Sequence, residues 1–170
     1  GSFKSLFESG CVEFLDQTYY HSLAGLWEDK AEWVEQVKKH REAVKSLLGA
    51  EPSVIENTEL LFNSAIAKTA EELGYRGIFA EGVARSLQGG SPNYVFKVKG
   101  CHSIRVLFRN YQLTDDIGFR FSSRQWPEWP LTADKYVSWL ANTPGQCINI
   151  FADYETFGEH HSPQTGVFDF

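Results

Sequence analysis

Cysteine is scarce in this sequence, and no two cysteines lie close together. The three present, Cys11, Cys101 and Cys147, lack the C-x-x-C spacing that thiolate zinc sites use. We therefore expect neither a disulfide framework nor a thiolate-bound metal. A reducing compartment, and hence a cytoplasmic location, is the default expectation.

Long apolar runs and basic clusters are also absent. No stretch reaches the roughly 18 apolar residues of a membrane-spanning helix, and residues 1–10 lack the apolar core of a signal peptide. The net charge is -6, and the longest basic cluster, residues 38–41, falls within a helical pattern. We therefore expect neither a membrane nor a nucleic acid to be the main partner.

Apolar residues are nevertheless frequent enough to form a packed core. Hydrophobic residues make up 42% of the 170 residues, and aromatic residues make up 15%. The sequence ends on residues 166–170, whose apolar side chains look like the start of a further helix. We expect a single globular domain that is a fragment of a longer protein.

Hydrophobic periodicity predicts alternating strands and helices. The expected strands cover residues 11–15, 53–55, 77–80, 104–108 and 147–151. The expected helices cover residues 31–48, 60–73 and 133–141, and a long loop is expected at residues 89–100. This order predicts an α/β fold with parallel strands joined by right-handed crossovers. The five predicted strands, with the helices between them, are too few to close an eight-stranded barrel.

Polar residues follow the ends of the predicted strands. Glu59 follows one strand, although it also lies where an acidic residue would stabilise the first turn of its own helix. Asp153 follows the last strand and is accompanied by two further acids and two histidines. In α/β barrels the carboxyl ends of strands hold the catalytic groups, and two carboxyl groups are enough to cleave a glycosidic bond. The other polar residues at strand ends are Glu13, Glu81, and Asn110 with Asp115 and Asp116.

Three segments together resemble glycoside hydrolase family 57, especially its α-amylase and amylase-like members. They are residues 12–21, residues 57–60 and residues 153–160, in an order that covers nearly the whole chain. The resemblance implies an incomplete seven-stranded (β/α) barrel, with residues 1–170 as part of its catalytic domain. It also implies retaining cleavage or transfer of α-glucan linkages, with an α-glucan or maltooligosaccharide as substrate and no cofactor or metal.

The sequence departs from the family pattern at both ends. The His-Gln-Pro motif of the family's first strand is absent, and so is the motif that follows the Asp153 strand. Because both motifs contribute substrate contacts in the family, we expect the isolated chain to bind glucans weakly and to show little or no turnover.

The resemblance assigns roles to individual residues. Glu59 matches the family's nucleophile, and Asp153 matches its general acid/base. A retaining mechanism needs these two carboxyl groups roughly 5 to 5.5 Å apart. Nearby Glu155 and Glu159 would raise the proton affinity of Asp153 by like-charge repulsion. The expected substrate-binding residues are Glu13, Tyr20, His21, Glu81, Trp126, Tyr154, Glu155, Phe157 and His160.

Two other functions compete with this interpretation. One is a noncatalytic, amylase-like protein that binds glucans. The other is a metal-dependent carbohydrate hydrolase or deacetylase that uses His160, His161 and Asp153 as ligands, although no H-E-x-x-H spacing is present. Hydrolysis and transglycosylation also remain alternatives, because both pass through the same glycosyl-enzyme.

Overall fold

The computed structural model describes all residues from Gly1 to Phe170 and divides into two compact units. Unit 1 contains residues 1–81 and 95–107, and unit 2 contains residues 82–94 and 108–170. None of the helices combines the length and the apolar character that crossing a membrane requires.

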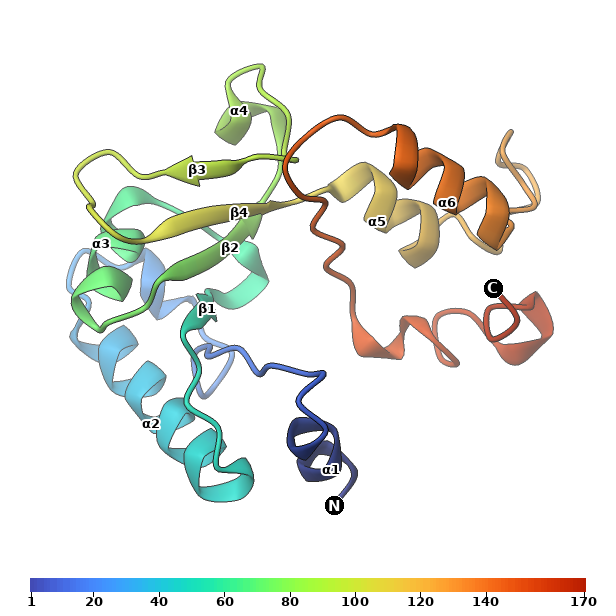
Figure 1. Ribbon diagram of the computed structural model, residues 1–170. Helices are drawn as coiled ribbons and strands as arrows, with labels where there is room; N and C mark the ends of the chain where they lie inside the picture. The colour runs from blue at the N-terminus through green and yellow to red at the C-terminus, as the bar shows by residue number, and fades with distance from the viewer. The chain divides into compact units, whose positions relative to one another are not determined.

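A four-stranded sheet runs through unit 1 in the order β1-β2-β4-β3 (Figure 1). β1 (Val54–Glu56) pairs in parallel with β2 (Gly77–Glu81), with Ile55 opposite Ile78. This pairing confirms the predicted parallel arrangement for these two strands. β3 (Val95–Lys97) forms an antiparallel hairpin with β4 (Arg105–Arg109), whose last two residues belong to unit 2.

The β3–β4 hairpin corrects two expectations. Residues 89–100 were expected to form a loop, and the sheet was expected to be all-parallel. Gly100, in a left-handed conformation with a φ of 86°, lies between the two strands. Glycine and polar residues on either side of residues 95–97 hid this short strand from the sequence pattern.

The main helix of unit 1 is α2 (Ala31–Leu48), with the bounds that the periodicity predicts. It buries Trp33 and Val37 completely and ends at Gly49, whose φ of 76° suits a left-handed cap. α1 (Ser2–Glu8), η1 (Leu23–Leu26) and η2 (Thr58–Leu60) are the short helices of this unit.

α3 (Ser64–Glu72) connects β1 with β2 and begins later than predicted. Asn63 caps it by accepting a hydrogen bond from the Ile66 N–H group at 2.9 Å. The predicted helix at residues 60–73 was therefore wrong for residues 60–63. Glu59 lies before the helix and does not contribute to its first turn.

Asp16 is a fully buried carboxylate in unit 1. It lies 2.9 Å from Nδ1 of His40 and 3.1 Å from Nε of Arg41, and it accepts a 2.5 Å hydrogen bond from the Tyr75 hydroxyl. Its backbone also forms a parallel bridge with Ile55 of β1. The predicted strand at residues 11–15 was wrong, because this part of the chain forms only the single bridge at Asp16.

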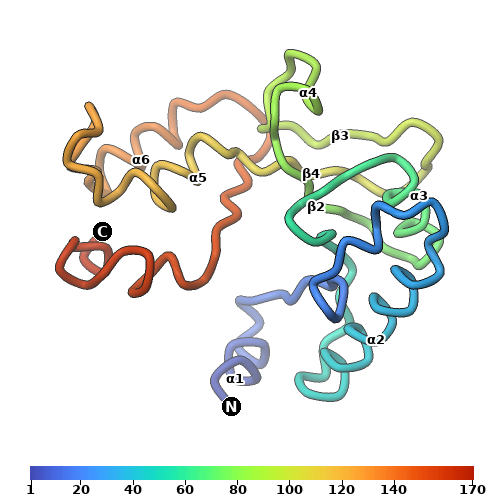
Figure 2. Tube along the Cα trace, turned by 180° about the vertical axis from the view of Figure 1, so that it is seen from behind, coloured from blue at the N-terminus to red at the C-terminus, as the bar shows by residue number.

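Unit 2 is built mainly from two helices, α5 (Tyr111–Gly118) and α6 (Ala133–Asn142), which run side by side in Figures 1 and 2. Asn110 caps α5, and Thr132 caps α6. The Tyr136 hydroxyl donates a 3.0 Å hydrogen bond to the Leu113 carbonyl and so connects the two helices. The sequence analysis predicted α6 but missed α5. The buried core of this unit consists of Leu113, Ile117, Phe121, Leu131, Tyr136 and Val167.

The remaining helices of unit 2 are short. They are α4 (Ala84–Leu87), η3 (Tyr154–Thr156) and η4 (Pro163–Thr165).

Residues 147–151 do not form the predicted buried strand. Asn149 accepts one backbone hydrogen bond from Asn110 at 2.9 Å, while its side-chain amide donates to the Phe108 carbonyl at 3.1 Å. Ile150 is 40% exposed. Side-chain hydrogen bonds thus replace a regular ladder, so the apolar run that predicted a strand forms an irregular extended segment.

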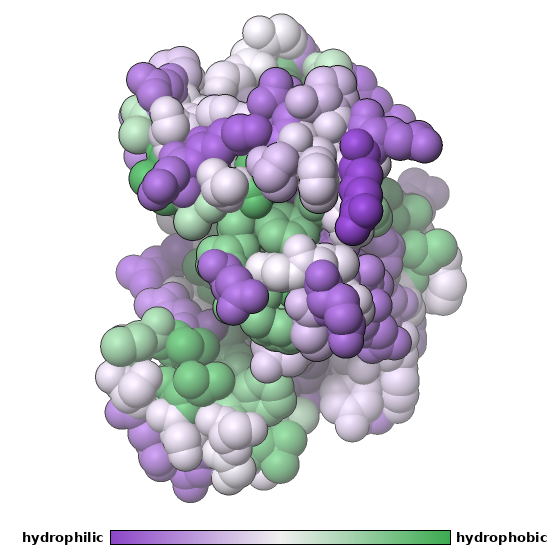
Figure 3. Space-filling view, turned by 90° about the vertical axis from the view of Figure 1, so that its right-hand side faces the viewer, coloured by the Kyte–Doolittle hydropathy of each residue, from purple (hydrophilic) through white to green (hydrophobic).

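Large apolar side chains also reach the surface. Phe119, Val137 and Phe168 of unit 2 are each at least 60% exposed. In the space-filling view, apolar areas interrupt the polar surface of the face shown (Figure 3). Such areas are common on proteins and do not by themselves define a binding site.

Candidate functional site

The backbone of unit 1 has an unusual conformation at Glu59. Glu59 and Leu60 have φ values of 57° and 54°, so two successive residues other than glycine are left-handed. Side chains disfavour this region, and such strain persists only where the surroundings enforce it. Strained backbone of this kind is concentrated at functional sites.

Two buried residues before Glu59 hold its loop in place. Asn57 accepts a 2.8 Å hydrogen bond from the Trp33 indole and donates a 3.0 Å bond to the Leu61 carbonyl. Thr58 shares a 2.6 Å hydroxyl–hydroxyl bond with Thr18. Because both side chains have their polar atoms satisfied inside unit 1, they can enforce the strained turn that follows.

Gly25 of η1 packs directly against this support. A Cβ atom at Gly25 would lie 2.6 Å from Oδ1 of Asn57 and 3.0 Å from the Trp33 ring. The first distance is shorter than any ordinary contact. The close approach of η1 to Asn57 therefore requires glycine at this position.

His21 contacts the carboxylate of Glu59. The His21 Nε2 atom lies 2.9 Å from Glu59 Oε1, and the two side chains are 60% and 69% exposed. The structure thus brings together two residues that the sequence analysis placed in the site. Neither side chain is covered within unit 1, so the carboxylate remains accessible to a substrate.

Glu56, the last residue of β1, is a carboxyl group that the sequence analysis did not place in the site. Burial raises its pKa to about 7 and outweighs the opposing effects of His21 and the Leu60 N–H group, while nearby Glu59 raises it further. The available signal in the sequence was its position three residues before Glu59, immediately after an apolar run. A protonated carboxyl group therefore neighbours the Glu59 loop at mildly acidic pH.

The other predicted residues of unit 1 are spread over several elements. Tyr20 is 61% exposed, and the Lys39 ammonium lies 4.5 Å from the centre of its ring. Glu13 is exposed in the irregular segment before Asp16, and Glu81 is the partly buried end of β2. Of these, Tyr20 adjoins His21 in the sequence.

The segment around Asp153 belongs to unit 2 and is anchored by two buried residues, Thr156 and His161. The His161 N–H group donates to the Thr156 carbonyl at 3.1 Å, and the turn between them contains Gly158 with a φ of 111°. This anchoring leaves most of the polar and aromatic side chains of the segment on the surface. The exposed residues are Asp153, Tyr154, Glu155, Phe157, Glu159 and His160.

His161 has a structural environment, which argues against the metal-site alternative. It is 3% exposed, and its Nε2 atom lies 2.8 Å from the Ile117 carbonyl. Its Nδ1 atom lies 2.9 Å from the Ser122 hydroxyl. Both ring nitrogens are thus engaged by protein groups, whereas neighbouring His160 is exposed. The two histidines do not converge with Asp153 as ligands.

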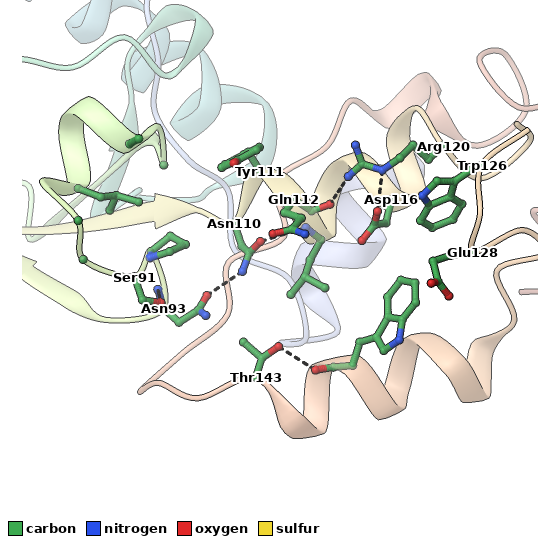
Figure 4. Close-up of a pocket in the computed structure, with 18 residues that line it drawn as sticks. Ser91, Asn93, Asn110, Tyr111, Gln112, Asp116, Arg120, Trp126, Glu128 and Thr143 are labelled. Carbon is green, nitrogen blue, oxygen red and sulfur yellow. Dashed lines mark hydrogen bonds and ion pairs between the residues drawn. The ribbon is translucent and has the colours of Figure 1, made fainter.

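Trp126 lines a pocket of about 960 Å³ that lies wholly within unit 2 (Figure 4). Asp116 and Asn110, which the sequence analysis placed near strand ends, line the same pocket. Arg120 and Trp139 line it as well and were not predicted. Arg120 follows α5, and Trp139 lies on α6. Helical periodicity alone does not indicate that either residue lines a pocket.

The structure thus defines an α/β protein in which the accessible carboxylate of Glu59 follows β1, and in which the segment around Asp153 exposes further carboxylates and aromatic side chains. The sequence model of glycosyl hydrolase family 57 matches residues 1–170, so the chain belongs to that family. A Methanocaldococcus jannaschii protein named "Putative alpha-amylase" is 50% identical over 168 residues, which cover 99% of this chain.

Among solved structures, the 4-α-glucanotransferase from Thermococcus litoralis resembles this chain with a TM-score of 0.75. The match covers 98% of this chain at 19% sequence identity, so the likeness concerns the fold. It confirms the α/β fold and fits the expectation that the chain forms part of a larger barrel. The chain spans 36% of the length of the M. jannaschii protein and 25% of the glucanotransferase.

Proposed function

We propose that the full-length protein is a retaining glycoside hydrolase or 4-α-glucanotransferase that acts on α-glucans or maltooligosaccharides. Residues 1–170 would form part of its catalytic barrel. Family membership supports the reaction class, and the names of the two similar proteins support the substrate class. The free thiols of Cys11, Cys101 and Cys147 support a cytoplasmic location.

The observation that supports this proposal most directly is the strained loop at Glu59. Buried Asn57 and Thr58 fix the loop, and His21 lies against the exposed carboxylate. A nucleophile must be accessible and held in one direction, because attack on the anomeric carbon requires aligned reacting atoms. The Glu59 carboxylate combines both properties.

In the proposed mechanism, Glu59 attacks the anomeric carbon while Asp153 donates its proton to the departing glycosidic oxygen. This step forms a glycosyl-enzyme ester and releases the leaving sugar. Asp153, now ionised, then removes a proton from water or from a sugar hydroxyl, which attacks the same carbon and releases Glu59. Water gives hydrolysis, and a sugar acceptor gives transglycosylation.

The mechanism requires a particular arrangement of the two carboxyl groups. We expect them to lie about 5 to 6 Å apart in a crystal structure of the full-length protein. A separation beyond about 9 Å would be too long for a retaining mechanism and would exclude Glu59 as its nucleophile.

Product analysis of the full-length protein on maltooligosaccharides tests the proposal. We expect shorter or redistributed glucans with retained anomeric configuration, and we expect Glu59→Gln to abolish this turnover. Glu72→Gln is the matched control, because Glu72 is an exposed glutamate of the same unit. Unchanged turnover in Glu59→Gln would show that another residue is the nucleophile.

A further inference from the structure

The pocket in unit 2 has three walls that come from different parts of the sequence. One wall is the segment from Gly82 to Asn93, the second is α5, and the third runs from Trp126 to Thr143 (Figure 4). Its volume of about 960 Å³ lies at the upper end of the usual range for ligand sites in proteins. The pocket is therefore large enough for a sugar unit with its neighbours.

One end of the pocket is rigid because two asparagines hold each other. The Asn110 amide donates to Oδ1 of Asn93 at 2.9 Å, and Oδ1 of Asn110 accepts from the Leu113 N–H group at 3.0 Å. Both asparagines are more than nine-tenths buried. The strand end and the start of α5 are thus fixed before any ligand binds.

Asp116 provides a hydrogen-bond acceptor that the chain uses only in part. Its side chain is 9% exposed, and its Oδ1 atom accepts a 2.7 Å hydrogen bond from Nε of Arg120. No group of the chain donates to the second oxygen, and the carboxylate extends from α5 toward the interior of the pocket in Figure 4. Burial raises the pKa of Asp116 despite the opposing effect of Arg120. A ligand that donated a hydrogen bond would reduce this cost of desolvation.

Two indole rings supply the apolar surface. The centres of the Trp126 and Trp139 rings lie 6.0 Å apart at an interplanar angle of 80°, and both residues line the pocket. Aromatic surface beside a few polar groups matches a sugar, whose ring has apolar C–H faces and hydroxyls at its edge.

The charges of the lining residues disfavour an anionic ligand. Arg120 is the cation of the lining, and it is already engaged by Asp116 and by the Gln112 carbonyl at 2.7 Å. Glu128 adds a second negative charge. A phosphate or carboxylate ligand would meet this excess of acid, whereas a wholly apolar ligand would leave the second oxygen of Asp116 without a donor. A neutral, hydroxyl-rich ligand satisfies both constraints.

We propose that this pocket binds a glucosyl unit of an α-glucan, with Asp116 accepting a sugar hydroxyl and Trp126 and Trp139 packing against the ring. The choice of an α-glucan rests on the proposed function, whereas the preference for a neutral sugar rests on the pocket itself. Trp126, which the sequence analysis placed among the substrate-binding residues, then acts in this pocket.

Calorimetric titration of maltotriose into the full-length Glu59→Gln variant tests this proposal without turnover. Asp116→Asn keeps the side-chain size but loses the charged acceptor, so we expect the affinity to fall roughly tenfold to a hundredfold. Trp126→Ala should also weaken binding by roughly tenfold or more. Phe119→Ala, a change of an exposed aromatic residue outside the pocket, should leave the affinity unchanged.

The outcomes separate this inference from the proposed function. Wild-type protein that cleaves or transfers α-glucans, together with unchanged affinity in both pocket variants, would overturn the pocket assignment and leave the function intact. An inactive wild-type protein whose maltotriose affinity still fell in the variants would overturn the function and support the pocket. Thermal unfolding reports whether the variants fold. If they do not, a maltotriose-soaked crystal of Glu59→Gln decides, and an unoccupied pocket would overturn the assignment.

Discussion

The Nε2 atom of His21 lies 2.9 Å from Oε1 of Glu59, although the two residues are 38 positions apart in the sequence. Buried Asn57 and Thr58 fix the backbone before Glu59, whereas His21 contacts the carboxylate itself. The backbone and the side chain of Glu59 are therefore held by different groups, so their effects can be separated by mutation.

His21→Ala in the full-length protein should lower kcat/KM on maltooligosaccharides by about tenfold, because one hydrogen bond that orients the nucleophile is lost. Steady-state kinetics give this value, and circular dichroism should show an unchanged fold, since His21 is exposed. His102→Ala, an exposed histidine of the same unit, is the control. Equal activity of the His21 variant and the control would remove His21 from the site.

Asp153→Asn should lose activity on natural glucans by about 10² to 10⁴, because the leaving oxygen is no longer protonated. With activated aryl glucosides, whose leaving groups need no proton, the rate of glycosyl-enzyme formation should fall much less. Added azide should then yield an azido sugar of retained configuration, detectable by mass spectrometry and NMR. Equal losses on both substrates, with no effect of azide, would assign Asp153 to substrate positioning.

Glu56→Gln should stabilise the protein, and more strongly at pH 8 than at pH 5. Because burial raises the pKa of Glu56 to about 7, the folded state retains a proton that the unfolded chain loses near pH 4.5. Below pH 4.5 Glu56 therefore does not lower the free energy of unfolding. Between pH 4.5 and about pH 7 it lowers this free energy by an increasing amount. Denaturant unfolding at both pH values should show a difference of roughly 1 to 3 kcal/mol. A stability change that is the same at both pH values would contradict the buried-carboxyl interpretation.

Asp16→Ala should destabilise the protein by about 3 to 5 kcal/mol, because it leaves Arg41 and the Tyr75 hydroxyl without their buried partner. The midpoint of urea unfolding measures this loss. Glu72→Ala, at an exposed position, should change stability by less than about 0.5 kcal/mol. A loss as small for Asp16 as for Glu72 would mean that the buried cluster contributes little to folding.

The sequence predicts those elements of the fold that have a clear period and a clear end. The bounds of α2 were correct because its apolar face is regular and Gly49 ends it. The strand at residues 147–151 was wrong, because an apolar run does not reveal whether a partner strand is available. Helix α5 was missed because its cap, Asn110, directly follows β4 and so looked like a strand-end residue.

The candidate site divides in a similar way. The structure places His21 against Glu59, a contact that the sequence did not predict. The roles of His21, Glu59 and Asp153 remain proposals. Glu56 was not predicted because its environment depends on burial, which a local pattern does not report. Asp116 was noticed only as an acid after a strand, since its pocket forms from segments distant in the sequence.

Gly25 makes the Glu59 loop vulnerable to mutation at a distance. Any larger residue at this position would displace the Asn57 amide or the Trp33 indole, and so release the strained turn, without altering a single acidic residue. A random-mutagenesis screen for inactive enzyme should therefore recover changes at Gly25 alongside changes at the acids. Protein designers who graft new loops onto this scaffold would have to keep Gly25 unchanged.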